Sequence, residues 1–258
     1  MQNQVSKLQT EKPQNRYLWK FFDLFKFIAF IQETELFFSR LDYVDDYLEG
    51  SDIESNSIIR TIARTQNKTR INELLTVIAQ LKRIQKKFYA SCFFSSNDES
   101  IAMWSLYSQN KGIAIRFDSM QLLNYILEKA QEVNDLEVFF GKIEYENSST
   151  RFLRRLAPTD KDKLFNPFLK DRAYIHEDEF RILFYQETNL DTSGIKIKID
   201  DLTKLNFKIF VPNETKKWEK NVIEKLIKKY GINERVIVSD IIMKETVQGL
   251  ILDSIFEK

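Results

Sequence analysis

The chain has 258 residues, of which 43% are hydrophobic and 30% are charged, as in a globular protein with a sizeable core. Its 39 basic and 38 acidic residues balance, which argues against a broad face for duplex nucleic acid. Cys92 is the only cysteine, so an internal disulfide and a multi-cysteine zinc site are excluded. No stretch approaches the ~20 apolar residues of a membrane span, and we expect a cytoplasmic protein without membrane partners.

The organisation of the chain favours one domain. Residues 1–16 are polar and are predicted to form a flexible N-terminal segment. Residues 17–240 are predicted to form a single domain with a helical insertion near 51–87, and residues 241–258 an apolar tail. No Pro-, Gly- or Ser-rich linker divides the chain, so a second domain has no obvious boundary.

The first half of the chain alternates irregularly between predicted helices and strands. Asp23 is placed to cap a helix that continues to Ile31, and Asn97 to Ser100 supply a helix start before residues 101–108. The other predictions in this half are a strand at 36–41, an acidic turn at 42–50, helices within 51–87, strands at 88–94 and 112–117, and a helix capped by Asp118.

The second half is richer in strands. Gly231 is expected to close an amphipathic helix that starts at Lys216. The other predictions are strands at 138–145, 179–186, 195–199, 207–211 and 236–239, and a helix near 161–172. Because strands outnumber any regular alternation with helices, we predict an α+β fold with a mixed or antiparallel sheet and flanking helices.

The segment from Tyr174 to Phe184 carries the main candidate for chemistry. On a strand, Glu177, Glu179 and Arg181 share one face, because side chains alternate with a period of two. The row is interpreted either as a solvated series of ion pairs or as a site. A carboxylate there can hold a ribose hydroxyl or stabilise an oxocarbenium-like transition state, and a neighbouring arginine keeps the carboxylate ionised.

Two further groups of residues are candidates for ligand binding. Trp104 and Tyr107 lie three residues apart on one side of a short helix, where they either pack in the core or provide a stacking wall for a flat ring. Lys20 and Arg40 lie among aromatic residues, where they either pack their stems on apolar groups or contact phosphate.

Other chemistry has little support. His176 is the only histidine, and we expect it to be a partly exposed residue at the entry to a strand rather than a catalytic base. Cys92 lies in an apolar strand, so its thiol is expected to be inert. A metal-dependent nuclease would need clustered carboxylates, for which Asp45, Asp46 and Glu49 are the candidates, although acidic turns are usually only solvated.

Three segments in order give the chain a family resemblance. They are LWKFFDLFKFIAFIQETELFFSRLDYVDDYLEG, CFFSSNDESIAMWSLYSQNKGIAIRFD and AYIHEDEFRILF. Together they resemble the bacterial family known as domain of unknown function 2971 (DUF2971), over about residues 17–240. The family often has an Asn-Asp-Pro-x-Glu turn near the first segment, whereas this chain has Asp45-Asp46-Tyr47-Leu48-Glu49.

A second likeness suggests a mechanism. A basic residue on an early strand, a central aromatic residue and a late Glu-x-Glu are similar in order to the ADP-ribosyltransferase fold. The resemblance implies NAD as substrate, with Glu179 as the catalytic glutamate and Glu177 as its upstream partner. It also implies Lys20 near the adenosine ribose and Trp104 or Tyr107 against nicotinamide.

We therefore expect an NAD-using transferase or NAD-consuming enzyme of a bacterial toxin or anti-phage defence type, with a protein or nucleic-acid acceptor. The alternative is a non-enzymatic module that senses a nucleotide or binds a protein. An enzyme predicts that Glu179, Lys20 and Trp104 meet in one cleft. A binding module predicts that Glu179 and Arg181 face solvent or pair only with each other.

Overall fold

The computed structural model describes residues 10–44, 64, 68–108, 112–133, 135–146, 165–188 and 192–241. Predictions for residues 1–9, 45–63, 147–164 and 242–258 lie outside this part of the chain. The described residues form an α+β fold with a mixed, mostly antiparallel open sheet and flanking helices, which confirms the predicted class. Among these residues, no helix has the length and apolarity that crossing a bilayer requires.

The chain divides into two compact units. Unit 1 takes its described residues from Met1–Pro13, Phe37–Cys92 and Leu127–Ile197. Unit 2 takes its described residues from Gln14–Leu36, Phe93–Ile126 and Lys198–Lys258. The chain passes between the units several times, so no single linker exists for the composition to reveal.

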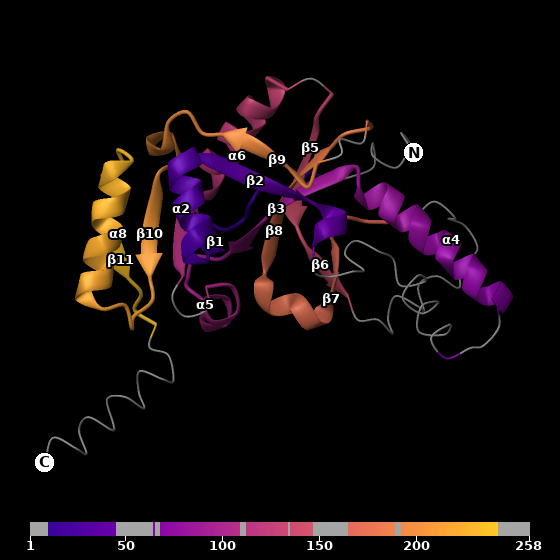
Figure 1. Cartoon of the computed structure of the whole chain (residues 1–258), viewed down its shortest axis with the longest axis horizontal. Coiled ribbons are helices and arrows are strands. Elements are labelled where there is room, and N and C mark those ends of the chain that lie inside the picture. Colours follow the sequence, from indigo (N-terminus) through magenta and orange to yellow (C-terminus); the bar gives the residue numbers. More distant parts are fainter. Residues whose placement is uncertain are drawn as a thin grey trace, which may run out of the picture. The chain divides into compact units, whose positions relative to one another are not determined.

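The elements follow in chain order (Figure 1). They are β1 (Tyr17–Phe22), α2 (Leu24–Glu33), β2 (Glu35–Arg40), the 3-10 helix η1 (Leu41–Tyr43), α4 (Lys68–Gln85), β3 (Phe88–Ser95), α5 (Ile101–Tyr107), β4 (Ile113–Asp118), α6 (Ser119–Gln131), β5 (Glu137–Lys142), β6 (Glu144–Glu146), β7 (Leu169–Asp171), the 3-10 helix η2 (Arg172–Glu177), β8 (Glu179–Tyr185), β9 (Gly194–Lys198), the 3-10 helix η3 (Leu202–Leu205), β10 (Phe207–Val211), α8 (Lys217–Lys229) and β11 (Val236–Val238).

In unit 2, β4 lies at the centre, with antiparallel β1 on one side and antiparallel β10 on the other. Strand β11 pairs in parallel with β10, and α8 connects them; Figure 1 shows this helix alongside both strands. The cap predicted for α2 is present, since Asp23 accepts a hydrogen bond from the backbone of Lys26. One apolar cluster of this unit holds Trp19, Phe94, Met103, Trp104, Ala114 and Phe210.

In unit 1, β8 pairs with β3 and with antiparallel β5, and β2 pairs with β3. The predicted strand at 138–145 is interrupted at Ile143, because the chain leaves β8 there and β6 pairs in parallel with β7 in a separate two-stranded sheet. The helix predicted near 161–172 is wrong over its described residues, where β7 and the start of η2 are found. The apolar cluster of this unit holds Leu41, Phe88, Ala90, Phe139, Ile143, Phe168, Leu183 and Tyr185.

Candidate functional site

One face of β8 changes from apolar to charged along its length. Leu183 and Tyr185 belong to the apolar cluster of unit 1, whereas Glu179 and Arg181 continue the same face as charged residues. These two side chains are nevertheless almost completely buried, with 2% and 1% of their surface exposed. Buried charges need partners, because removing an ion from water is costly.

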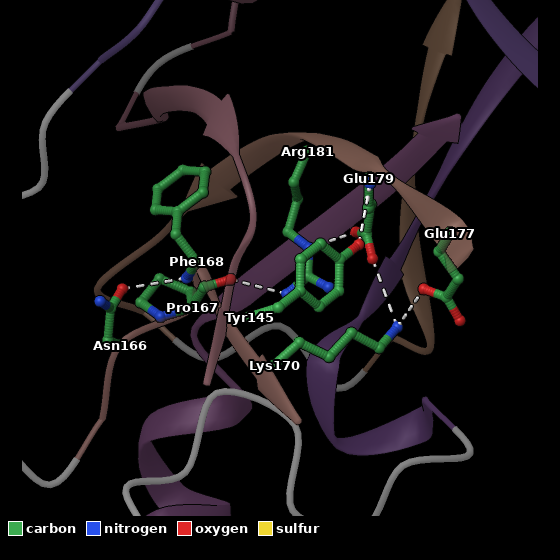
Figure 2. Close-up of polar contacts among 8 residues, drawn as sticks. All are labelled: Tyr145, Asn166, Pro167, Phe168, Lys170, Glu177, Glu179 and Arg181. Atoms are coloured by element: carbon green, nitrogen blue, oxygen red, sulfur yellow. Dashed lines mark hydrogen bonds and ion pairs between the residues drawn. The ribbon is translucent and has the colours of Figure 1, made fainter. Parts of the chain in front are cut away.

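The partners come from a short stretch before β8. Lys170, in β7, places its Nζ 2.6 Å from Glu177 Oε2 and 3.3 Å from Glu179 Oε2. Arg181 donates from Nε to Glu179 Oε1 at 2.6 Å and from Nη1 to the carbonyl of Pro167 at 2.6 Å. Figure 2 shows the Lys170 side chain reaching both carboxylates. We call Lys170, Glu177, Glu179 and Arg181 the charged cluster; it holds two positive and two negative groups.

The backbone around Asp178 brings the two glutamates together. The strand predicted to carry Glu177 starts only at Glu179, and Glu177 is the last residue of η2. Asp178 between them has φ 34° and ψ 52°, the left-handed conformation that ends η2. Glu177 and Glu179 therefore do not share a strand face as predicted, but both reach Lys170.

The charges determine the ionisation of Glu179. Burial by itself raises the pKa of this carboxyl, but Arg181 and Lys170 outweigh burial and lower the pKa to about 2. Glu179 is therefore a carboxylate at neutral pH. Such a group is a weak general base, and it is suited to stabilising positive charge or accepting a hydrogen bond.

Backbone contacts fix the position of Glu179. Its N–H donates to the Tyr145 hydroxyl at 2.9 Å, and its carbonyl accepts from the Ile143 N–H at 2.8 Å. Burial raises the pKa of the Tyr145 hydroxyl, so this group stays protonated. The Pro167 carbonyl that Arg181 binds lies next to Phe168, whose N–H donates to Asn166 Oδ1 at 3.0 Å (Figure 2).

Cys92 borders the charged cluster from β3. Cys92 as a whole residue is exposed, but protein atoms surround its thiol. This burial of the thiol is the main cause that raises the pKa of Cys92 to about 12. The nearby charge of Glu179 raises this pKa further, and the thiol hydrogen-bonds to that carboxylate. Cys92 thus lies next to Glu179, a contact that the apolar sequence around Cys92 did not predict.

We expect the Cys92 thiol to react slowly despite its exposure. A pKa near 12 leaves little thiolate at neutral pH, although the higher basicity of the thiolate partly offsets this loss. Alkylation by iodoacetamide at pH 7.5 should be roughly 10- to 100-fold slower than that of a free cysteine. Mass spectrometry of timed samples, with a cysteine peptide as control, measures the ratio. Alkylation at the rate of the peptide would contradict the assigned environment.

The predicted ligand residues of unit 2 do not lie together. Trp104 is fully buried in the apolar cluster of unit 2, packs edge-on against Phe21 with ring centroids 5.2 Å apart, and donates from Nε1 to Glu99 at 2.9 Å. Lys20 lies on the opposite face of β1 from Phe21, with its Nζ 4.8 Å from the centre of the Phe93 ring. Tyr107, the other aromatic candidate besides Trp104, is 41% exposed.

Arg40 in unit 1 is held by its neighbours. Its Nε lies 2.6 Å and its Nη2 3.3 Å from the two carboxylate oxygens of Asp42, a bidentate pair. The guanidinium also lies 4.9 Å from the centre of the Tyr43 ring. These contacts account for an arginine that is 4% exposed, and they occupy much of the donor fork predicted to contact phosphate.

The remaining sequence candidates add nothing to the cluster. His176 is partly exposed as predicted, but it lies in η2 rather than at the start of a strand. Asp45, Asp46 and Glu49, the candidates for a nuclease metal site, lie outside the described residues. Within the described ranges, no three His, Cys, Asp or Glu residues gather as a metal site.

Lys170 is the cluster residue that the sequence did not reveal. It lies in a three-residue strand, which is too short to show an alternating pattern. One signal was present: two closely spaced glutamates beside a buried strand need more positive charge than Arg181 supplies. That signal gives the charge of the missing partner but not its position, because β7 is placed by pairing with β6.

The comparisons with known proteins give one match. Residues 103–182 match the family model described as "Protein of unknown function (DUF2971)", which confirms the predicted family resemblance over that stretch. The stretch begins in α5 and ends in β8, and it contains all four residues of the charged cluster. No curated protein and no solved structure matches the chain. The likeness to ADP-ribosyltransferases gains no support from these comparisons.

Proposed function

We propose that the charged cluster is the catalytic centre of an enzyme that cleaves the nicotinamide–ribose bond of NAD. The observation that supports this most directly is the ionised state of Glu179, whose pKa is lowered to about 2 in a buried setting. Departure of nicotinamide leaves a positively charged ribose, and a fixed carboxylate with little surrounding water stabilises that charge.

The contacts of Glu179 suggest how a substrate is held. Oε1 is fixed by Arg181 at 2.6 Å, whereas Oε2 has a longer contact of 3.3 Å with Lys170. Lys170 is closer to Glu177 than to Glu179. A ribose hydroxyl can therefore replace Lys170 at Glu179 Oε2 while Lys170 remains paired with Glu177. In the proposed step, the carbon–nitrogen bond breaks, and its electron pair leaves with nicotinamide. A water or acceptor hydroxyl then bonds to the ribose carbon and gives its proton to Glu177.

The alternative is a module that binds a nucleotide without chemistry. It is favoured by the internal neutrality of the cluster, in which each charge already has an opposite partner. Glu179 pairs with Lys170 as well as Arg181, which is more than the simplest form of this alternative predicts. A role in defence or as a toxin, and the identity of any acceptor, remain predictions of the same proposal.

The test is nicotinamide release from NAD by the full chain, followed by chromatography. Glu179→Gln should lower kcat by about 100- to 1,000-fold with a smaller effect on KM, because the lost charge acts mainly in the transition state. Exposed Glu128 in α6 provides the matched control, and Glu128→Gln should keep the wild-type rate. Circular dichroism of each variant separates loss of activity from loss of fold.

Three results would count against the proposal. Release at the wild-type rate by Glu179→Gln would remove this residue from the mechanism. Binding of NAD by calorimetry without release, alone and with cell extract to supply an acceptor, would support the non-enzymatic module instead. If the protein neither binds NAD nor releases nicotinamide from it, NAD is excluded as the ligand.

A further inference from the structure

Unit 2 contains an arginine, Arg116, whose guanidinium lies among three aromatic rings. Arg116 is in the central strand β4, and its guanidinium carbon lies 4.1 Å from the centre of the Tyr17 ring, 5.3 Å from that of Trp19 and 5.0 Å from that of Phe210. Its Nε is buried and has no hydrogen-bond acceptor. In the described part of the chain, no carboxylate pairs with this guanidinium.

The residues around Arg116 increase the positive charge. Lys208 of β10 lies directly opposite Arg116 in the antiparallel pair, so both side chains are on one face. Like charges in such a pair repel each other. Arg16 is exposed, and its guanidinium carbon lies 5.2 Å from the centre of the Tyr17 ring. Arg16 and Arg116 therefore both lie against the Tyr17 ring, and Lys208 lies opposite Arg116, in a protein whose total charge is nearly balanced.

Asp118, an acid on the same face of β4 as Arg116, has another partner. Asp118 follows Arg116 by two residues on β4, and it accepts a hydrogen bond from the backbone of Gln121 at the start of α6. No ion pair joins Asp118 to Arg116 among the described residues. Three aromatic rings lie against the guanidinium, but the residue keeps partial exposure, so its exposed part can donate hydrogen bonds to a ligand.

We propose that Arg116, Lys208 and Arg16 form a binding site for the phosphate group of a small molecule. A guanidinium stripped of part of its water and without a counter-ion attracts an anion more strongly than a solvated one. The planar fork of Arg116 suits two phosphate oxygens, and Lys208 adds a point charge beside them. This site lies in unit 2, and its existence does not depend on the activity proposed for the charged cluster.

The test is isothermal calorimetry of the full chain with inorganic phosphate, pyrophosphate and AMP, in chloride buffer of constant ionic strength. Arg116→Gln should weaken binding by about 10- to 100-fold, as expected for losing hydrogen bonds to a charged group. Lys208→Gln should weaken it less, and Arg116→Lys should restore only part of the affinity. The matched control is Arg235→Gln, which removes the same charge from an exposed arginine of unit 2.

Thermal unfolding gives an independent readout. Without ligand, Arg116→Gln should melt close to the wild type, because the substitution removes an unpaired buried donor and a like-charge contact along with the ring contacts. Pyrophosphate should raise the Tm of the wild type and of Arg235→Gln but not that of Arg116→Gln. Binding of AMP but not of the inorganic ions would assign the site to a nucleotide. Equal affinities of Arg116→Gln and Arg235→Gln, or no binding of any probe at millimolar concentration, would overturn the proposal.

Discussion

Replacing Arg181 with methionine should lower the free energy of unfolding by about 3–5 kcal/mol at pH 7. The substitution keeps an extended side chain but removes the cation 2.6 Å from Glu179 and the donor to the Pro167 carbonyl. Glu179 is 2% exposed, so water cannot replace these contacts without disturbing the packing. Urea unfolding at pH 7, followed by circular dichroism, measures the difference.

The control is an ion pair in the same region that remains in water. Lys142 and Asp178 approach to 2.7 Å, but their side chains are 45% and 40% exposed. Lys142→Met should therefore cost less than about 1 kcal/mol. The double variant Arg181→Met with Glu179→Gln should be more stable than Arg181→Met alone, because it removes the buried carboxylate that Arg181→Met leaves with only its longer ion pair to Lys170. Equal unfolding midpoints for Arg181→Met and Lys142→Met would contradict the buried network.

Acid should destabilise the protein through Glu179. Its carboxyl has a folded-state pKa of about 2, below its ordinary value of 4.5, so the ionised form favours the folded state. This contribution is complete above pH ~5 and is lost as pH falls toward 2, because protonation then costs more in the folded state. The difference between the two pKa values corresponds to a contribution on the order of 3 kcal/mol.

The pH dependence of the Tm checks this directly. The wild type should lose stability more steeply than Glu179→Gln between pH 5 and pH 2, and the two curves should converge at the acid end. Glu128→Gln, which removes an exposed carboxyl, should keep the wild-type slope. If the Tm curve of Glu179→Gln runs parallel to that of the wild type across the whole pH range, the pKa of Glu179 is the same in the folded and unfolded states.

The sequence predicted those features that depend on near neighbours in the chain. The cap of α2 at Asp23 and the cap of α5 at Ser100 are local signals, and both were found. Residues 165–171 show the limit of such signals. Their polar, mixed sequence favoured a helix, whereas Leu169–Asp171 forms a strand because it pairs in parallel with Glu144–Glu146. Periodicity within one segment carries no information about such distant pairing.

The candidate site was predicted in part for the same reason. Glu179 and Arg181 follow from alternation along one strand, and they are in contact as the pattern suggests. Lys170 and Cys92 belong to other strands, and only the pairing of β7 with β6 and of β3 with β8 brings them to Glu179. Trp104 could not be assigned to core or ligand site from the sequence, because an aromatic residue on a short helix fits both; the structure shows it fully buried.

The left-handed conformation of Asp178 sets which substitutions position 178 can accept. Its φ of 34° is strained for residues with a branched Cβ and easy for glycine, with asparagine and aspartate among the few side chains that tolerate it. The aspartate carboxylate has a different role, because it pairs with exposed Lys142 outside the charged cluster. Tolerance at this position is therefore governed by backbone geometry, and sequence variation there should track glycine, asparagine and aspartate rather than acidic character. A neutral glycine between the two glutamates would leave the spacing of the cluster intact.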